Sequence, residues 1–150
     1  MKKVLNVLAL LFLSVVITGC ASGTKFSEMQ GSLPDLNPDS GRIYIYRTAV
    51  FGAAIQPDVF LNGEKVCKAV PQGLIYLDKE PGDYKVRAST EVTRSLSFTL
   101  DPGQTRYIRL DVTMGFFMGH VSPVLIDEEK GKKEILKCKY TAPQNAQASL

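Results

Sequence analysis

Hydrophobic and polar residues alternate along most of the chain after residue 41, which is the period of a strand buried on one face. In the clearest case, Tyr84, Val86 and Ala88 alternate with Lys85 and Arg87. Turn residues separate these apolar runs at intervals of about 8 to 12 residues, a spacing typical of all-β domains. The predicted strands are 42–47, 58–61, 65–70, 73–78, 84–88, 96–100, 107–112 and 121–126.

The turns between these runs favour hairpins. Asn62-Gly63 separates two strands, and both residues tolerate the positive φ that a tight hairpin turn requires. Pro81-Gly82-Asp83 and Asp101-Pro102-Gly103-Gln104 carry the same turn chemistry. No long helical period follows residue 41. The pattern therefore predicts an antiparallel β-sandwich, immunoglobulin-like or prealbumin-like, over residues 41–140.

The last part of this region has two interpretations. Residues 134–139 can form a strand that pairs with 121–126 across Lys130-Gly131, and this is the favoured prediction. A short helix over 127–138 is the alternative. The charged run Glu128-Glu129-Lys130 faces solvent in both. Residues 141–150 are polar, and we expect a frayed tail.

A different pattern precedes the domain. Lys2 and Lys3 come before an apolar run, residues 4–16, which is followed by Ile17-Thr18-Gly19-Cys20. The run is short for a membrane span, which needs about 20 residues. A basic start, a short apolar stretch and small residues before a cysteine are typical of a bacterial lipoprotein signal covering residues 1–19. An uncleaved anchor helix and an ordinary secretory signal are the alternatives.

Resemblance to bacterial lipoproteins implies what happens at Cys20. Its sulfur would receive a diacylglycerol, and its new amine would be acylated after cleavage; two or more acyl chains hold a protein stably in a bilayer. In envelopes of the enteric type, an aspartate after this cysteine retains the protein at the inner membrane. Ala21 therefore predicts the outer membrane, facing the periplasm, with the inner membrane as the less favoured location.

Residues 20–40 are rich in Gly, Pro, Ser, Asp and Asn, and this composition predicts a tether between the lipid and the domain. Phe26, Met29, Leu33 and Leu36 interrupt it at near-helical spacing, so part of the segment is expected to pack on the domain. Gly31 and Pro34 argue against one continuous helix.

The net charge bears on nucleic acid as a partner. The formal charge of +3 falls to about +1 once Lys2 and Lys3 leave with the signal. No basic stripe with interleaved aromatic residues remains, so nucleic acid is not an expected partner.

Two cysteines remain in the domain, Cys67 and Cys138. In an oxidising compartment thiols tend to pair, and the predicted state is a disulfide between them. Two free buried thiols and a chemically active pair are the alternatives. A zinc site is disfavoured, because His120 is the single histidine and zinc needs three or four ligands. No metal or cofactor is predicted.

Four segments resemble a family of bacterial lipoproteins that carry one uncharacterised β-sandwich domain. They are Gly41-Arg42-Ile43-Tyr44-Ile45-Tyr46-Arg47, Val59-Phe60-Leu61-Asn62-Gly63-Glu64-Lys65-Val66, Pro81-Gly82-Asp83-Tyr84-Lys85-Val86 and Gln104-Thr105-Arg106-Tyr107-Ile108-Arg109. In order and spacing they cover about residues 41–138. The resemblance implies fold and location; it carries no activity and no catalytic residues.

The residues themselves offer little catalytic chemistry. His120 has no triad motif around any serine. The carboxylates Asp127, Glu128 and Glu129 are adjacent, whereas a calcium loop spaces them at alternate positions. We therefore expect no enzymatic activity. A second hypothesis is a glycan- or peptidoglycan-binding groove lined by the strand tyrosines Tyr44, Tyr46, Tyr76 and Tyr107.

Two loops depart from the pattern, residues 49–55 and 114–119. Both contain glycine and large apolar residues, and neither carries a charge. They either tuck into the core or form an exposed apolar patch for a partner. The leading hypothesis is a non-catalytic envelope lipoprotein, anchored in the lipid bilayer by acylated Cys20, that binds a protein partner or a second copy of itself. The candidate contact residues are Phe51, Phe116, Phe117 and Met118.

Overall fold

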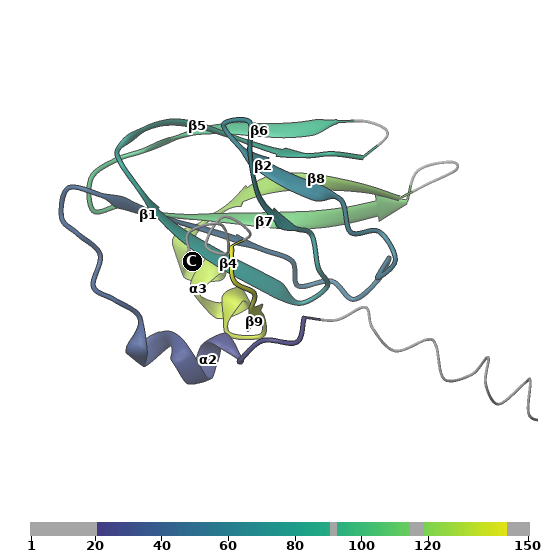
Figure 1. Cartoon of the computed structure of the whole chain (residues 1–150), viewed down its shortest axis with the longest axis horizontal. Coiled ribbons are helices and arrows are strands. Elements are labelled where there is room, and N and C mark those ends of the chain that lie inside the picture. Colours follow the sequence, from purple (N-terminus) through teal and green to yellow (C-terminus); the bar gives the residue numbers. More distant parts are fainter. Residues whose placement is uncertain (1–20, 91–92, 115–118, 144–150) are drawn as a thin grey trace, which may run out of the picture.

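The computed structural model describes residues 21–90, 93–114 and 119–143, and it confirms the predicted all-β sandwich (Figure 1). One sheet has four strands in the order β3-β2-β5-β6, and the other has five in the order β8-β7-β1-β4-β9. The strands are β1 (Gly41–Tyr46), β2 (Asp58–Leu61), β3 (Glu64–Lys68), β4 (Gly73–Lys79), β5 (Gly82–Ala88), β6 (Arg94–Leu100), β7 (Thr105–Met114), β8 (Gly119–Ile126) and β9 (Lys139–Tyr140).

All eight strands predicted from the alternation are present, with ends that differ by a few residues. The β2–β3 hairpin turns at Asn62 and Gly63, whose φ values are +49° and +88°. Only residues that accept a left-handed backbone fit this turn, which is why the dipeptide locates the hairpin so well.

The prediction of a wholly antiparallel sandwich is corrected at two places. β1 pairs with β4 in antiparallel orientation but with β7 in parallel orientation, and β4 pairs with β9 in parallel orientation. The chain passes through the whole four-stranded sheet between β1 and β7. No local turn joins these two strands, so no sequence signal specified their relative direction.

The five-stranded sheet is buried on both faces. Ile43 and Ile45 of β1 point into the space between the sheets, and Tyr44 and Tyr46 point to the outer face, yet all four are buried. The core between the sheets is mainly aliphatic, with Phe98 as its buried aromatic residue, and the core on the outer face combines aromatic and aliphatic side chains. The outer core contains Phe26, Tyr44, Tyr46, Leu74, Tyr107, Ile126, Ile135 and Cys138.

Helix α3 (Glu128–Ile135) covers part of that outer face, so the favoured prediction of a strand over 134–139 is wrong and the helical alternative is correct. Asp127 caps the helix by accepting a hydrogen bond from the Lys130 backbone N–H at 2.9 Å. Glu128 and Glu129 occupy the first turn, where they face the positive end of the helix dipole.

Two contacts hold α3 on the sheet. Gly131 lies against Tyr107, and a Cβ added there would stand 2.3 Å from Cγ of that ring, so the close approach depends on glycine. Glu134 accepts hydrogen bonds from the Tyr46 hydroxyl and the Arg109 guanidinium, each at 2.8 Å. The pKa of Tyr46 is raised mainly by burial and, to a smaller extent, by its hydrogen bond to the Glu134 carboxylate.

The segment predicted as a tether is largely docked. It forms α2 (Phe26–Met29) and a 3₁₀ turn, η1 (Gln30–Ser32), and it runs along the outer face of the five-stranded sheet (Figure 1). The Ala21 and Phe26 side chains are buried. The Phe26 N–H donates to the Cys138 carbonyl at 2.9 Å. The predicted packing of the apolar residues is thus confirmed, but it begins at residue 21 and leaves little free tether.

The predicted disulfide is absent, because Cys67 and Cys138 are both free thiols. Cys67 belongs to the core between the sheets, and Cys138 belongs to the outer core. The five-stranded sheet separates these two cores. Burial raises the pKa of each thiol to about 12.

These thiols predict an alkaline loss of stability. They stay protonated in the folded chain and ionise near pH 9 when it unfolds, so the stabilisation is complete below that pH and falls as pH rises. We expect the free energy of unfolding to drop by about 1.5 kcal/mol between pH 7.5 and 9.5 for the two thiols together. Urea titrations under reducing conditions measure it. The Cys67→Ala/Cys138→Ala variant should show a flatter profile; an equally steep one would contradict the assignment.

Candidate functional site

A buried arginine organises the loop between β1 and β2. Arg47 directly follows β1, and its side chain has no exposed surface. No carboxylate is within ion-pairing distance among the described residues. The guanidinium donates instead to five backbone carbonyls at 2.7–3.1 Å. The acceptors are Ala49, Phe51, Gly52, Ile55 and Ala69.

This arrangement braces the loop, whose other internal hydrogen bonds include those from the Ile55 N–H to the Gly52 carbonyl and from Gln56 Nε2 to the Ala53 carbonyl, each at 2.8 Å. Four of the five acceptors lie in the loop. The guanidinium thus supplies these carbonyls with the hydrogen bonds that neighbouring strands supply within a sheet. Burial lowers the pKa of Arg47, but arginine remains protonated in proteins. A fixed positive charge thus sits beneath a loop that has no charged side chain of its own.

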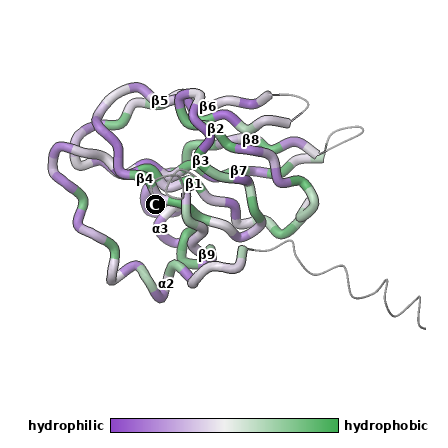
Figure 2. Tube along the Cα trace, viewed as in Figure 1, coloured by the Kyte–Doolittle hydropathy of each residue, from purple (hydrophilic) through white to green (hydrophobic). Residues whose placement is uncertain are grey.

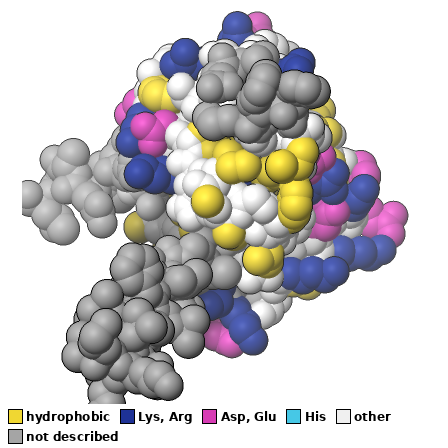
Figure 3. All heavy atoms as spheres, turned by 90° about the vertical axis from the view of Figure 1, so that its right-hand side faces the viewer, with side chains coloured by type: hydrophobic (Ala, Val, Ile, Leu, Met, Phe, Trp, Pro, Cys, Tyr) yellow, Lys and Arg dark blue, Asp and Glu magenta, His cyan; other side chains and the backbone are white. Residues whose placement is uncertain are grey.

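The loop exposes apolar side chains at one end of the sandwich. The exposed fractions are 50% for Val50, 61% for Phe51 and, at the end of β7, 67% for Met114. We call the surface formed by these three side chains the apolar end. Figure 3 views this end directly and shows hydrophobic side chains near its centre, with basic and acidic side chains towards its edges. In Figure 2 the β1–β2 loop is mostly hydrophobic.

The two predicted apolar loops do converge at their bases. A Cβ added to Gly52 would lie 3.0 Å from Cγ1 of Val112 on β7, and one added to Gly119 would lie 2.2 Å from Cδ1 of Ile55. The first loop therefore packs on the strands that carry the second. Phe51 is exposed as predicted, while Phe116, Phe117 and Met118 lie outside the described residues.

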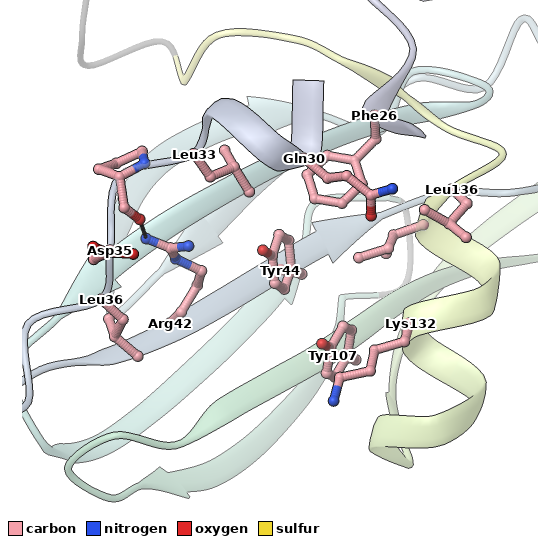
Figure 4. Close-up of a pocket in the computed structure, with 12 residues that line it drawn as sticks. Phe26, Gln30, Leu33, Asp35, Leu36, Arg42, Tyr44, Tyr107, Lys132 and Leu136 are labelled. Carbon is pink, nitrogen blue, oxygen red and sulfur yellow. Dashed lines mark hydrogen bonds between the residues drawn. The ribbon is translucent and has the colours of Figure 1, made fainter. Parts of the chain in front are cut away.

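A separate groove of about 470 Å³ lies on the outer face of the five-stranded sheet (Figure 4). Its floor contains Tyr44 and Tyr107, from neighbouring strands, with ring centroids 5.2 Å apart. Residues 33–36 form one wall and α3 forms the other. The remaining lining residues are Phe26, Gln30, Arg42, Lys132, Ile135 and Leu136.

Arg42 supports the wall made by residues 33–36. Its Nη2 donates to the Pro34 carbonyl at 2.9 Å (Figure 4). The same side chain forms two hydrogen bonds to Asp78 of β4, at 2.6 and 2.7 Å. This pairing, in which the Asp78 hydrogen bond contributes most, raises the pKa of Arg42. Two of the three guanidinium nitrogens, Nε and Nη2, are thus engaged by the protein.

The strand tyrosines gather on one sheet face, as the glycan hypothesis requires, but they are not an open platform. Tyr44, Tyr46 and Tyr107 are buried beneath α2 and α3, and Tyr76 is half-buried. The Tyr46 hydroxyl is bonded to Glu134. Burial raises the pKa of Tyr107 to about 12. A sugar ring stacks on an exposed aromatic face, and these rings offer mainly their edges to the groove.

The other residues considered for catalysis or metal binding lie in separate parts of the fold. His120 lies on β8 opposite Thr113, and its Nδ1 is buried without a hydrogen-bond partner. Asp127, Glu128 and Glu129 form the cap and first turn of α3. Across the described ranges, no group of three or more His, Cys, Asp or Glu side chains is placed to hold a metal. In those same ranges no helix has the length and apolar character of a membrane span.

Val50 and Met114 lie in the two loops that the sequence singled out, although they were not among the candidate contact residues. Sequence reasoning missed Arg47. The available signal was a lone arginine that follows an apolar strand and precedes ten residues without a charge. An arginine in that position is usually assigned to the surface, because charged residues are rarely fully buried.

The fold and these surfaces define a class of protein, an all-β sandwich domain with one covered outer sheet face and one apolar end. The chain belongs to the family described as protein of unknown function (DUF2846), whose model matches residues 37–122. A Haemophilus influenzae protein described as uncharacterized is 26% identical over 129 residues, which covers 83% of this chain and 77% of the relative. The predicted membership of an uncharacterised domain family is confirmed. α2, α3 and β9 lie outside the matched range.

Replacing Arg47 should destabilise the domain strongly. Arg47→Met keeps the apolar stem but leaves buried carbonyls without a donor, and each such group costs about 1–3 kcal/mol. We expect a loss of about 3 kcal/mol in the free energy of unfolding, measured by urea titration. Arg106→Met is the matched control, since Arg106 makes an exposed hydrogen bond to the Thr99 carbonyl. Equal losses in the two variants would contradict the role assigned to Arg47.

Proposed function

We propose that this protein is a membrane-anchored lipoprotein of the cell envelope, acylated at Cys20 and facing the periplasm at the outer membrane. Its domain is a non-catalytic module that docks against another component of the envelope through the apolar end. The signal pattern before Cys20 and the Ala21 that follows it support the anchoring and the location.

One observation carries the docking part of the proposal, namely that the exposed apolar side chains are gathered on a braced loop. Five large hydrophobic side chains are exposed among the described residues, and three of them form the apolar end. A clustered, exposed apolar surface is a solubility liability unless something covers it. Covering a side chain such as Phe51 completely contributes about 1.5–3 kcal/mol. Because Arg47 already orders the loop, little conformational entropy is lost on binding.

A second candidate function is the binding of a small ligand or glycan fragment in the tyrosine-floored groove. The lining of the groove favours this second function, since the walls combine apolar side chains with the polar ends of Gln30 and Lys132. The buried state of Tyr44 and Tyr107 makes it the weaker of the two. Titration of the protein with soluble peptidoglycan fragments, followed by NMR shifts of the groove residues, tests it.

Cys20→Ala should abolish the attachment. Without the sulfur no diacylglycerol is added, and the lipoprotein peptidase leaves the precursor uncleaved. Radiolabelled palmitate incorporation and the mass of the mature N-terminus measure the two steps. Cys67→Ala is the control and should be labelled normally, because Cys67 is buried in the domain core. Palmitate on the Cys20→Ala protein would contradict the anchoring.

A photoreactive benzoylphenylalanine in place of Phe51 should crosslink to another envelope component in intact cells. The side chain is 61% exposed, so the replacement leaves the core untouched. The matched control is Leu125, an exposed apolar residue on β8 that lies outside the apolar end. Crosslinked products at position 51 and none at position 125 are expected. Equal products, or none at either position, would refute docking through the apolar end.

A further inference from the structure

The start of the described chain lies at the apolar end. Ala21 is buried, and its N–H donates to the Pro71 carbonyl at 3.1 Å. Pro71 lies two residues before Gly73, where β4 begins. Since β4 runs antiparallel to β1, Pro71 lies at the end of the sheet where β1 finishes. β7 runs parallel to β1 and reaches Met114 at that same end. Figure 1 shows the start of the described chain and the β1–β2 loop on the same side of the domain.

The connection between Cys20 and the docked part of the chain is short. Ala21, the residue that follows Cys20 in the sequence, is buried and hydrogen-bonded, and one peptide bond spans only 3.8 Å between Cα atoms. Further contacts secure the segment that follows: the Tyr140 N–H donates to the Thr24 carbonyl at 2.8 Å, and Lys25 forms a β-bridge with Lys139. A lipid on Cys20 therefore emerges from one fixed place on the domain surface.

The composition of this end suits a lipid interface. Residues 48–57 contain no charged side chain, so the loop can enter the headgroup region without desolvating a charge. Two exposed basic side chains flank it. Lys68 pairs in register with Asp58 at the beginning of β2, and Arg94 pairs with Ala88 at the end of β5. Asp58 lies at the same edge, but Lys65 pairs with it at 2.8 Å, so Lys68 and Arg94 can attract anionic headgroups.

We propose that the apolar end rests on the surface of the bilayer that holds the Cys20 lipid, with Val50, Phe51 and Met114 in the headgroup layer. The inference rests on the anchoring proposed above and names the component that covers the apolar end. Three side chains alone form a weak membrane contact. The short attachment makes the contact intramolecular, with an effective concentration on the order of millimolar or more.

A protein partner at this end would meet a geometric obstacle. It would have to fit between the domain and a bilayer that the attachment at Ala21 keeps close. The lipid surface needs no such space, and it covers all three apolar side chains at once.

The test measures the depth of single positions in a membrane. The lipidated protein is reconstituted into vesicles of phosphatidylethanolamine and phosphatidylglycerol, with an NBD fluorophore on Phe51→Cys or, independently, Met114→Cys. Cys67 and Cys138 are buried and do not compete for the label when it is added to folded protein. Pro102→Cys is the matched control, because it is exposed in the β6–β7 turn at the opposite end of the sandwich. Circular dichroism confirms that each labelled variant is folded.

We expect spin-labelled lipids to quench the fluorophore at positions 51 and 114 and to leave the one at 102 unchanged. Accessibility of 51 and 114 to aqueous iodide, on protein that is acylated and vesicle-bound, would overturn the inference while the anchoring stands. Burial of these positions in native membranes but not in protein-free vesicles would overturn it in favour of a protein partner. A Cys20 without acyl mass would remove the anchor and overturn the proposed function and the inference together.

Discussion

The buried guanidinium of Arg47 fixes the conformation of the loop that forms most of the apolar end. Arg47 terminates the central strand of the five-stranded sheet, and its five carbonyl acceptors hold the β1–β2 loop in one conformation. A buried charge is costly unless each of its donors is used, so the loop has few alternatives to the observed path. The apolar side chains that the loop exposes are thus presented by a rigid support and not by a mobile tip.

The second constraint is the covered outer face of the same sheet. β1 is buried on both sides, and its outward tyrosines need a lid that α3 and the segment beginning at Ala21 provide. Glu134 and Gly131 position the helix, while Phe26 packs edge-on against Tyr44 with ring centroids 5.6 Å apart. The family model matches residues 37–122, so most of this lid lies beyond the matched range.

These two constraints meet at one end of the sandwich. Docking of the N-terminal segment brings residue 21 to Pro71, and bracing by Arg47 holds the loop that exposes Phe51; both lie toward the end of the sheet where β1 finishes. A flexible segment would have left the position of residue 21 unrelated to the apolar end. Because the segment is docked, the fold itself sets where residue 21 lies relative to this end.

The strands and their hairpin turns could be predicted because alternation and turn residues act over a few neighbouring positions. Asn62-Gly63 and the run from Tyr84 to Ala88 are examples. The strand favoured over 134–139 is instead the end of a helix at 128–135. The Asp127 cap and the acidic first turn are local signals for that helix, while the contact of Gly131 with Tyr107 is tertiary. Cysteine pairing, the burial of Arg47 and the docking of Phe26 depend on which residues distant in sequence meet in space. The sequence by itself therefore determined the class of fold, while the tertiary structure decided how the two faces are covered and which end carries the apolar surface.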